Sequence, residues 1–420
     1  HAVETTAASV GIATDRSNPS HSVGRSNHEG TRMTQTADTD TTTDRKPTGA
    51  AADGRLRLVV FSDAFRHRNG VGAYYCDLLD SLDHSVQAQL VCPGPSPPGC
   101  YQARQGLSIP LPGDATQRLC LPGVLKALRV MREIQPDVVL GATPGPYGIL
   151  GMMLARRFKT PFCMAYHTQY DKLVDMYWNR VFRSISGRYL RWMDRRLFNR
   201  ARLVLTNSEH MVAAATELGA REVRLMGTPV EPRLLRDPTP PATDSFGPVL
   251  FVGRLAHEKN IDVFLDAARQ LQHIPFVIAG DGPLADEVSR TAAELDNVEY
   301  LGWVGREQLV ETLDQAEMLM LPSHVESFGT VAIEAMARGR MTMVSEHCGI
   351  IAWPTLKPGL EILYDDQSPV DALQALADLS ADERAAKCAR ARTQCQAFVQ
   401  ETLDYWLATL REAADDTARG

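Results

Sequence analysis

The chain has 420 residues, a net charge of −7, 44% hydrophobic residues and 23% charged residues. This length allows two full hydrophobic cores, and the composition is that of an ordinary globular protein. The acidic balance argues against general nucleic-acid binding. Residues 138–154 form the longest apolar candidate, but prolines and glycines interrupt it. A membrane-spanning helix needs roughly 18 apolar residues, so none is predicted.

The eight cysteines include no Cys-x-x-Cys pair and no Cys/His spacing typical of a metal site. We therefore expect reduced thiols in a cytoplasmic protein and no bound metal. Residues 1–53 are rich in Thr, Ser, Ala, Asp and Arg and nearly lack large apolar residues. This composition predicts a disordered tail without the apolar core of a secretory signal.

Order is predicted to begin with an apolar strand at residues 56–61. A loop containing Gly70 and Gly72 follows, and then a helix through Leu82. A strand, a glycine-containing loop and a helix form the opening unit of nucleotide-binding parallel sheets. Glycine also marks ordinary tight turns, so both interpretations stay open at this point.

Residues 54–228 continue to alternate buried strands with amphipathic helices. Strands are predicted at 87–92, 137–141, 162–166, 201–206 and 223–226, and helices at 122–134, 147–158 and 209–218. This alternation predicts a doubly wound α/β domain. His167 follows the strand 162–166, at the end where such sheets place functional residues. A structural hydrogen-bonding role would suit a single histidine equally well.

The stretch 172–202 carries nine basic residues and two opposing aspartates, with aromatic residues interleaved. A basic, aromatic helical surface suits docking on an anionic bilayer, to which each cation contributes on the order of 1 kcal/mol. The expected membrane-surface residues are Arg180, Arg183, Arg188, Trp192, Arg195 and Arg196. The alternative is a solvated helix whose arginines pair with carboxylates elsewhere. Nucleic acid is disfavoured, because no reading motif accompanies the charge.

Residues 229–247 are rich in proline and predict a linker, after which the α/β pattern restarts over 248–390. Strands are predicted at 249–252, 276–279, 298–301, 318–321 and 341–344, and a helical tail at 381–414. We expect residues 391–420 to pack back towards the first domain. Two such domains would enclose a cleft, which is a usual place for a site.

Residues 317–340 contain a strand, a loop with Glu326, a turn at Gly329, and a helix with Glu334 in its early turns. Free backbone N–H groups and the helix dipole make this arrangement an anion site. Two carboxylates beside such a site suit a phosphate flanked by hydroxyls, as in a sugar nucleotide. Arg254 and Lys259 lie on one loop and could neutralise a diphosphate.

Three motifs occur in order: Gly253-Arg254-x4-Lys259, Gly280-Asp281-Gly282-Pro283, and Glu326-x7-Glu334. Together they resemble the retaining GT-B glycosyltransferases of family 4, over about residues 56–400. The resemblance implies two Rossmann-like doubly wound domains facing each other across a cleft. It also implies transfer of a hexose from a UDP- or GDP-linked donor, with no cofactor and no metal.

The resemblance further implies roles for individual residues. Arg254 and Lys259 would hold the donor diphosphate, Glu326 the sugar hydroxyls, and Glu334 the ribose. The implied catalytic residues are His167, Glu326, Arg254 and Lys259. The implied donor-binding residues are Gly70, Gly72, Gly253, Arg254, Lys259, Gly282, Val304, Glu326, Ser327, Phe328, Gly329, Thr330 and Glu334. Gly70 and Gly72 would lie in a loop that closes over the diphosphate.

The stretch 166–170 is similar to the corresponding part of bacterial diacylglycerol glucosyltransferases. With the basic stretch that follows, it favours a lipid acceptor and an enzyme bound to the inner face of the cell membrane. The chain departs from the family pattern at 339–342 and 347–350, which leaves the donor sugar open. A soluble glycosyltransferase for polysaccharide or small glycosides, and an inactive GT-B scaffold, are the alternatives.

Overall fold

The computed structural model describes residues 54–64, 70–94, 108–111, 114–167, 180–238 and 245–415. Side chains are described in these ranges except at residues 70, 108–119, 180–187 and 210. The tail expected to be disordered, residues 1–53, lies outside the described part of the chain.

The first sheet has six strands in the order β2-β1-β5-β6-β7-β8, all paired in parallel. Its strands are β1 (Leu56–Phe61), β2 (Val86–Val91), β5 (Val138–Gly141), β6 (Phe162–Tyr166), β7 (Val204–Thr206) and β8 (Val223–Leu225). The central strands are continuous apolar runs because helices cover both faces of a parallel sheet.

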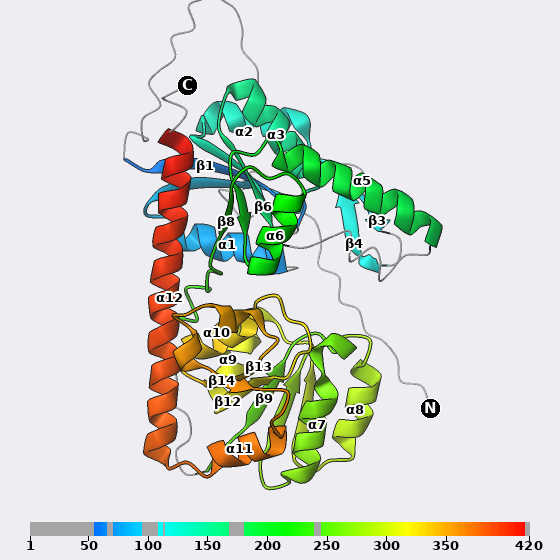
Figure 1. Ribbon diagram of the computed structural model, residues 1–420, viewed down its shortest axis with the longest axis vertical. Coiled ribbons are helices and arrows are strands. Elements are labelled where there is room, and N and C mark those ends of the chain that lie inside the picture. The colour runs from blue at the N-terminus through cyan, green and yellow to red at the C-terminus, as the bar shows by residue number, and fades with distance from the viewer. Residues whose placement is uncertain are drawn as a thin grey trace, which may run out of the picture. The chain divides into compact units, whose positions relative to one another are not determined.

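Two layers of helices cover this sheet (Figure 1). Val59 and Phe61 face one core, to which α2, α3, α5 and α6 contribute, and Leu58 and Val60 face the other, which α1 and α12 cover. The helices are α1 (Gly70–Leu82), α2 (Val124–Ile134), α3 (Pro146–Phe158), α5 (Arg180–Phe198), α6 (Glu209–Glu217) and α12 (Ala381–Asp415). The alternation along β1 follows from the two-residue period of a strand.

An antiparallel pair, β3 (Ser108–Leu111) with β4 (Asp114–Cys120), stands apart from the main sheet. We did not predict it. Its second strand is largely polar and its first contains Pro110, so neither has the apolar signal of the buried strands.

The second sheet also has six parallel strands, in the order β11-β10-β9-β12-β13-β14. Its strands are β9 (Val249–Val252), β10 (Phe276–Ala279), β11 (Val298–Gly302), β12 (Met318–Leu321), β13 (Met341–Ser345) and β14 (Glu361–Leu363). The strand order reverses between β9 and β12, and ligands bind doubly wound sheets at such a reversal. The fold class is therefore confirmed: both halves are doubly wound parallel sheets.

Five longer helices accompany the second sheet. They are α7 (Ile261–Gln270), α8 (Ala285–Ala293), α9 (Arg306–Gln315), α10 (Thr330–Ala337) and α11 (Pro369–Ala377). Phe264 of α7 and Leu373 of α11 belong to one core beside the sheet, while Ile333 of α10 belongs to the other. We did not predict α8, α11 or β14 from the sequence.

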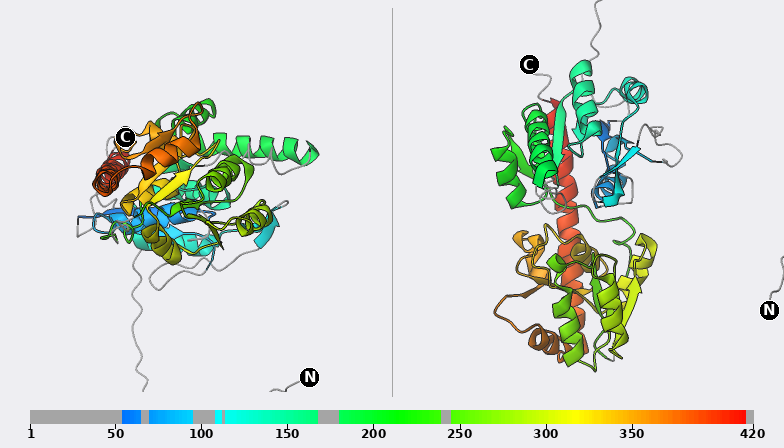
Figure 2. Two further views of the ribbon diagram at one scale, coloured as in Figure 1. Left: turned by 90° about the horizontal axis from the view of Figure 1, so that it is seen from below. Right: turned by 90° about the vertical axis from the view of Figure 1, so that its right-hand side faces the viewer.

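Helix α12 runs alongside both sheets (Figures 1 and 2). It contributes side chains to the core of each. Cys395 and Phe398 pack with α10, whereas Trp406 and Leu410 pack with α1. The segment predicted as a linker is packed as well, since Val230 and Leu234 are buried in the core of the second sheet. None of the described helices is long and apolar enough to cross a membrane.

Candidate functional site

Most of the predicted donor residues lie along one edge of the second sheet. Gly253 and Arg254 follow β9, Gly282 lies beyond β10, and Val304 lies just beyond β11. The segment from Glu326 to Thr330 connects β12 to α10. Because β11, β10, β9 and β12 are neighbours in a parallel sheet, their carboxyl ends meet at this edge.

A cavity of about 300 Å³ opens at the same edge. Its lining residues come from the ends of three strands: Val252, Gly253, Arg254, Ala279, Gly280, Asp281, Trp303 and Val304. Trp303 is 75% exposed, which is unusual for so large an apolar side chain. We did not predict Trp303, although an isolated tryptophan directly after a strand was a usable signal.

Two glycines bring the loops after β9 and β10 into contact. Gly280 has a φ of +155°, and a Cβ atom there would collide with the carbonyl oxygen of Gly253. A Cβ atom at Gly282 would collide with the backbone of Leu255. The Leu255 N–H donates to the Asp281 carbonyl at 3.0 Å, so the loops are also hydrogen-bonded. These positions therefore need glycine for close backbone approach.

Lys259 and Glu326 form an ion pair between the ammonium group and one carboxylate oxygen. Lys259 ends a short 3₁₀ turn, His257–Lys259, after β9, and Glu326 lies on the loop after β12. Their side chains are 20% and 19% exposed. The pair therefore spans the reversal of strand order, where the sheet is expected to bind its ligand.

The loop 326–329 rests on the segment that follows β13. The Gly349 N–H donates to the Glu326 carbonyl at 2.9 Å, and the Cys348 thiol donates to the Phe328 carbonyl at 3.3 Å. Gly329 precedes α10 with a φ of +90°. A Cβ atom there would lie 2.7 Å from Cys348 Sγ. Residues 347–350, one of the two segments that depart from the family pattern, thus support the backbone beside Glu326.

Glu334 is buried on α10 near a guanidinium group that we did not predict. Arg306 forms ion pairs with Asp77 at 2.8 Å and with Glu231 at 3.0 Å. Burial raises the pKa of Glu334 to about 7; the charge of Arg306 opposes this rise, while Asp77 and Glu231 add to it. Three largely buried carboxylates thus gather around one arginine, and Glu334 releases its proton only as the pH rises through about 7.

His167 lies directly after β6, against two tyrosines of α1. Its Nε2 atom is 2.8 Å from the Tyr75 hydroxyl, and the Tyr74 ring lies 4.7 Å from the imidazole, centroid to centroid. Burial lowers the pKa of His167 to about 4, so the imidazole is neutral at physiological pH. Its Nδ1 atom is buried and has no hydrogen-bond partner among the described residues.

Gly70 and Gly72 do not form a loop. Helix α1 begins at Gly70, and Gly72 lies buried in its first turn. The helix starts earlier than we predicted, because glycine at the start of a helix costs less than in its interior. The N-terminus of α1, rather than a flexible loop, therefore follows β1 and the undescribed residues 65–69.

Asp63 marks the reversal of strand order in the first sheet, between β1 and β5. Its carboxylate accepts from the Thr143 hydroxyl at 2.6 Å and from the Tyr147 N–H, in the first turn of α3, at 3.0 Å. Burial raises its pKa to about 6, although these hydrogen bonds oppose the rise. We did not predict this residue, whose partners lie 80 and 84 positions away in the sequence.

Helix α5 exposes the predicted basic surface where its side chains are described. Arg188, Trp192, Arg195 and Arg196 are all exposed. Trp192 is 57% exposed and stacks on Tyr189, with the ring centroids 6.1 Å apart. Arg180 and Arg183 lie on the same helix, but their side chains are outside the described part.

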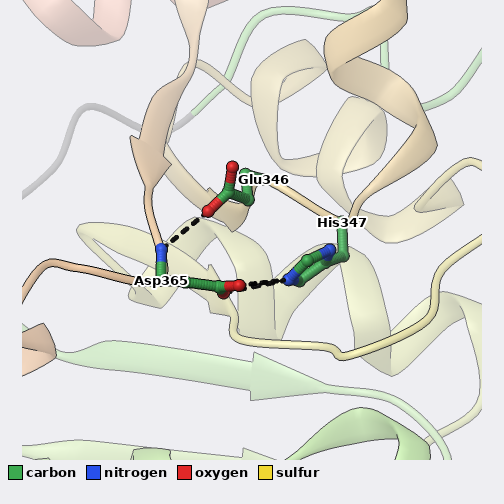
Figure 3. Close-up of side chains that lie close together, drawn as sticks. All are labelled: Glu346, His347 and Asp365. Atoms are coloured by element: carbon green, nitrogen blue, oxygen red, sulfur yellow. Dashed lines mark hydrogen bonds and ion pairs between the residues drawn. The ribbon is translucent and has the colours of Figure 1, made fainter.

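One group among the described residues could offer three metal ligands. Glu346, His347 and Asp365 place ligand atoms within 4.8 Å of one another (Figure 3). His347 Nε2 lies 2.9 Å from an Asp365 carboxylate oxygen, and the Asp365 N–H donates to Glu346 at 2.7 Å. These hydrogen bonds account for the arrangement, so we assign it no ligand.

Comparison with known proteins identifies the class. Residues 68–234 match the family model "Glycosyltransferase Family 4", and residues 243–394 match "Glycosyl transferases group 1". Together the two matches cover most of the described chain. They agree with the two doubly wound sheets and with the ordered motifs at the edge of the second sheet. The chain belongs to the GT-B glycosyltransferases of family 4.

Individual relatives are distant. The chain is 24% identical over 252 residues to alpha-monoglucosyldiacylglycerol synthase of Streptococcus pneumoniae, a match covering 55% of this chain and 57% of that protein. Sucrose-phosphate synthase from Thermosynechococcus elongatus superposes with a TM-score of 0.62 at 17% identity, over 85% and 98% of the two chains. The Anabaena protein HepE in complex with UDP and glucose gives 0.57 at 14% identity, over 85% and 100%.

Proposed function

We propose that the protein is a retaining glycosyltransferase that moves a hexose from a UDP- or GDP-linked donor to a membrane lipid such as diacylglycerol. The donor half rests on the edge of the second sheet. There Arg254 and Lys259 supply positive charge for a diphosphate beside the cavity, and Glu326 and Glu334 supply acceptors for hydroxyl groups. Arg254, Lys259 and Glu326 lie on loops that follow strand ends, where doubly wound sheets bind nucleotides, and Glu334 lies on α10.

The proposed chemistry is a front-face substitution. The bond between the anomeric carbon and the diphosphate oxygen breaks while the acceptor oxygen attacks from the same face. The acceptor proton passes to an oxygen of the leaving diphosphate, so no protein carboxylate has to serve as nucleophile. Lys259 and Arg254 stabilise the charge that develops on the diphosphate, the role of a metal ion in other transferases. Glu326, paired with Lys259, orients the sugar.

The acceptor half of the proposal rests on the surface charge of the first sheet's helical layers. Helices α2, α3 and α5 lie side by side over one face of this sheet. Their exposed arginines are Arg129, Arg132, Arg156, Arg157, Arg188, Arg191, Arg195 and Arg196. Among the described side chains of these helices, Glu133 is the one exposed carboxylate. A concentration of positive charge on an acidic protein favours an anionic partner.

The opposite layer has the reverse charge. Helix α1 carries Asp77 and Asp80 and no Lys or Arg, and the last part of α12 exposes four carboxylates beside Arg411. These four are Glu401, Asp404, Glu412 and Asp415. The domain is therefore polarised across its sheet, and the basic surface belongs to one layer. The basic surface ends at α6, which carries Glu209 and Glu217.

Apolar side chains are exposed on the same three helices. Leu125 of α2 is 83% exposed, Met153 of α3 59%, and Tyr189 and Trp192 of α5 55% and 57%. A surface that combines arginines with exposed leucine, methionine and aromatic rings suits the headgroup region of an anionic bilayer, where both kinds of side chain are stabilised. This combination is the observation that carries the lipid half of the proposal.

Vesicle flotation tests the lipid half. The full chain should float with vesicles containing phosphatidylglycerol but not with pure phosphatidylcholine. Reversing the α5 charges with Arg188→Glu, Arg195→Glu and Arg196→Glu should abolish flotation. Three reversals at exposed cations of the second half, Arg290→Glu, Lys357→Glu and Arg390→Glu, provide the matched control and should preserve it. If the parent chain does not float, a soluble acceptor replaces the lipid.

A further inference from the structure

The hydroxyl of Tyr75 and the Nε2 atom of His167 lie 2.8 Å apart, and both belong to the proposed acceptor side. We propose that Tyr75 is a positioning residue that holds His167 as the neutral tautomer with its proton on Nδ1. In this state His167 offers a bound substrate a hydrogen-bond donor and not a base. This inference rests on the proposed function in one respect, namely that the ligand of His167 Nδ1 is the substrate.

The direction of the hydrogen bond follows from the environment of Tyr75. This side chain is 0% exposed, and burial, with Tyr74 adding to the effect, raises its pKa well above the ordinary value, so the phenol keeps its proton. Among the described residues, His167 Nε2 is the partner of that hydroxyl. A buried phenol proton needs an acceptor, and Nε2 is the one that the described residues offer, so we assign the phenol as donor and Nε2 as acceptor. A neutral imidazole has one donor and one acceptor nitrogen, which places the ring proton on Nδ1.

The groups around the imidazole keep it neutral. From α1, the rings of Tyr74 and Tyr75 face it with centroid distances of 4.7 and 5.6 Å. In the described part of the chain, no carboxylate pairs with it to stabilise an imidazolium. Tyr74 cannot supply a competing hydrogen bond, because its hydroxyl donates to the Gly227 carbonyl at 2.8 Å. The imidazole thus meets two aromatic rings and one phenol donor.

The second ring nitrogen then has a specific use. Nδ1 is buried and lacks a partner among the described residues, and a buried N–H without an acceptor is costly. It lies at the carboxyl end of β6, on the edge where doubly wound sheets meet their ligands. An oxygen of the bound substrate would satisfy it. The acceptor proton still passes to the leaving diphosphate, so the donor role of His167 agrees with the proposed chemistry.

Ring nitrogens can be observed directly by ¹⁵N–¹H correlation spectra of the full chain labelled with ¹⁵N-histidine. His167→Asn identifies the His167 signals by difference. We expect Nδ1 to be protonated and Nε2 unprotonated, with no change between pH 8 and pH 5.5. A protonated Nε2, or a charged ring at pH 5.5, would overturn the proposal. This measurement needs neither a known acceptor nor enzymatic activity, so it stays valid if lipid transfer is not found.

Two phenol deletions separate positioning from packing. Tyr75→Phe removes the donor to Nε2, whereas Tyr74→Phe removes a buried hydrogen bond that does not involve the imidazole. Without this donor, the ring proton of His167 should no longer be confined to Nδ1. We expect Tyr75→Phe to lower kcat by about 100-fold, with an unchanged KM for the nucleotide sugar. Tyr74→Phe should keep both the tautomer and kcat. Activity is measured with UDP-glucose or GDP-mannose and a membrane lipid extract.

The outcomes are distinguishable. Equal losses of kcat in both variants, together with an unchanged tautomer in Tyr75→Phe, would mean that Tyr75 only packs, and the proposal would fail. If Tyr75→Phe does not fold, as judged by its melting temperature, the spectrum of the parent chain still decides the tautomer.

Discussion

Lys259 and Glu326 form an ion pair with each other across the reversal of strand order in the second sheet. We assign these two residues to different parts of the donor, Lys259 to the diphosphate and Glu326 to the sugar. A nucleotide sugar must therefore exchange this ion pair for contacts of its own. Within the pair, each partly buried charge is neutralised by the other.

If the donor replaces this ion pair, one substitution should strengthen binding of the free nucleotide and slow turnover of the nucleotide sugar. Glu326→Gln releases Lys259 from its internal partner, so UDP or GDP alone should bind up to roughly fivefold more tightly, the equivalent of about 1 kcal/mol. Turnover of the nucleotide sugar should fall by about 100-fold, because a sugar contact is lost. Isothermal titration and initial rates measure the two effects. Weaker binding of the free nucleotide would contradict the account.

Glu334 predicts a pH-dependent stability. Its pKa is raised by burial from 4.5 to about 7, so between these values the folded chain holds a proton that the unfolded chain has released. Stability from this group is present below pH 4.5 and is lost as the pH rises towards 7. The change in unfolding free energy caused by Glu334→Gln should therefore be more stabilising at pH 8 than at pH 5, by at most about 3 kcal/mol.

Urea unfolding of the parent chain and of Glu334→Gln at both pH values measures this difference. Glu307→Gln is a suitable control, since its side chain is 89% exposed. An equal effect of Glu334→Gln at pH 5 and pH 8 would show that Glu334 is ionised throughout.

Two glycines with positive φ should respond differently to alanine. Gly302→Ala, at φ +68° with open space around it, should cost about 1 kcal/mol of unfolding free energy from backbone strain alone. Gly280→Ala should cost about 2–4 kcal/mol, because its Cβ atom also meets the Gly253 carbonyl oxygen. Gly280→Ala should weaken donor binding as well, since it separates the loops that line the cavity. Equal costs would argue against this close approach.

Trp303 should contribute to donor binding through its exposed ring beside the cavity. Stacking of a base on an aromatic side chain is worth about 1–3 kcal/mol, so Trp303→Ala should raise KM for the nucleotide sugar by roughly 10-fold with little change in kcat. Trp192→Ala on α5 is a control for the loss of an exposed tryptophan and should leave that KM unchanged. An unchanged KM in Trp303→Ala would exclude stacking.

The sequence was most informative where one physical signal dominates. Buried parallel strands are continuous apolar runs, so β1 and β12 were predicted at their observed positions. The donor motifs lie directly after such strands, and their shared edge follows from parallel pairing. The β3–β4 pair was missed, because β4 is largely polar and β3 contains a proline, so neither has the apolar pattern of a buried strand.

Partners distant in the sequence could not be predicted. Tyr75 contacts His167, which is 92 positions away in the sequence, and Arg306 contacts Asp77, which is 229 positions away. Nothing in the local sequence marks either contact, since both depend on how the helices pack. The raised pKa of Glu334 likewise depends on burial and on charges from α1, α9 and the segment before β9. Tertiary packing therefore determines the electrostatics of a site whose residues the motifs can name.

The configuration of the product tests the central claim most directly. The chain would be incubated with UDP- or GDP-hexose and a membrane lipid extract, and the product characterised by mass spectrometry and by the anomeric coupling in its NMR spectrum. We predict a glycolipid with the anomeric configuration of the donor. A product of inverted configuration would contradict the retaining mechanism, and transfer solely to water-soluble acceptors would contradict the lipid acceptor.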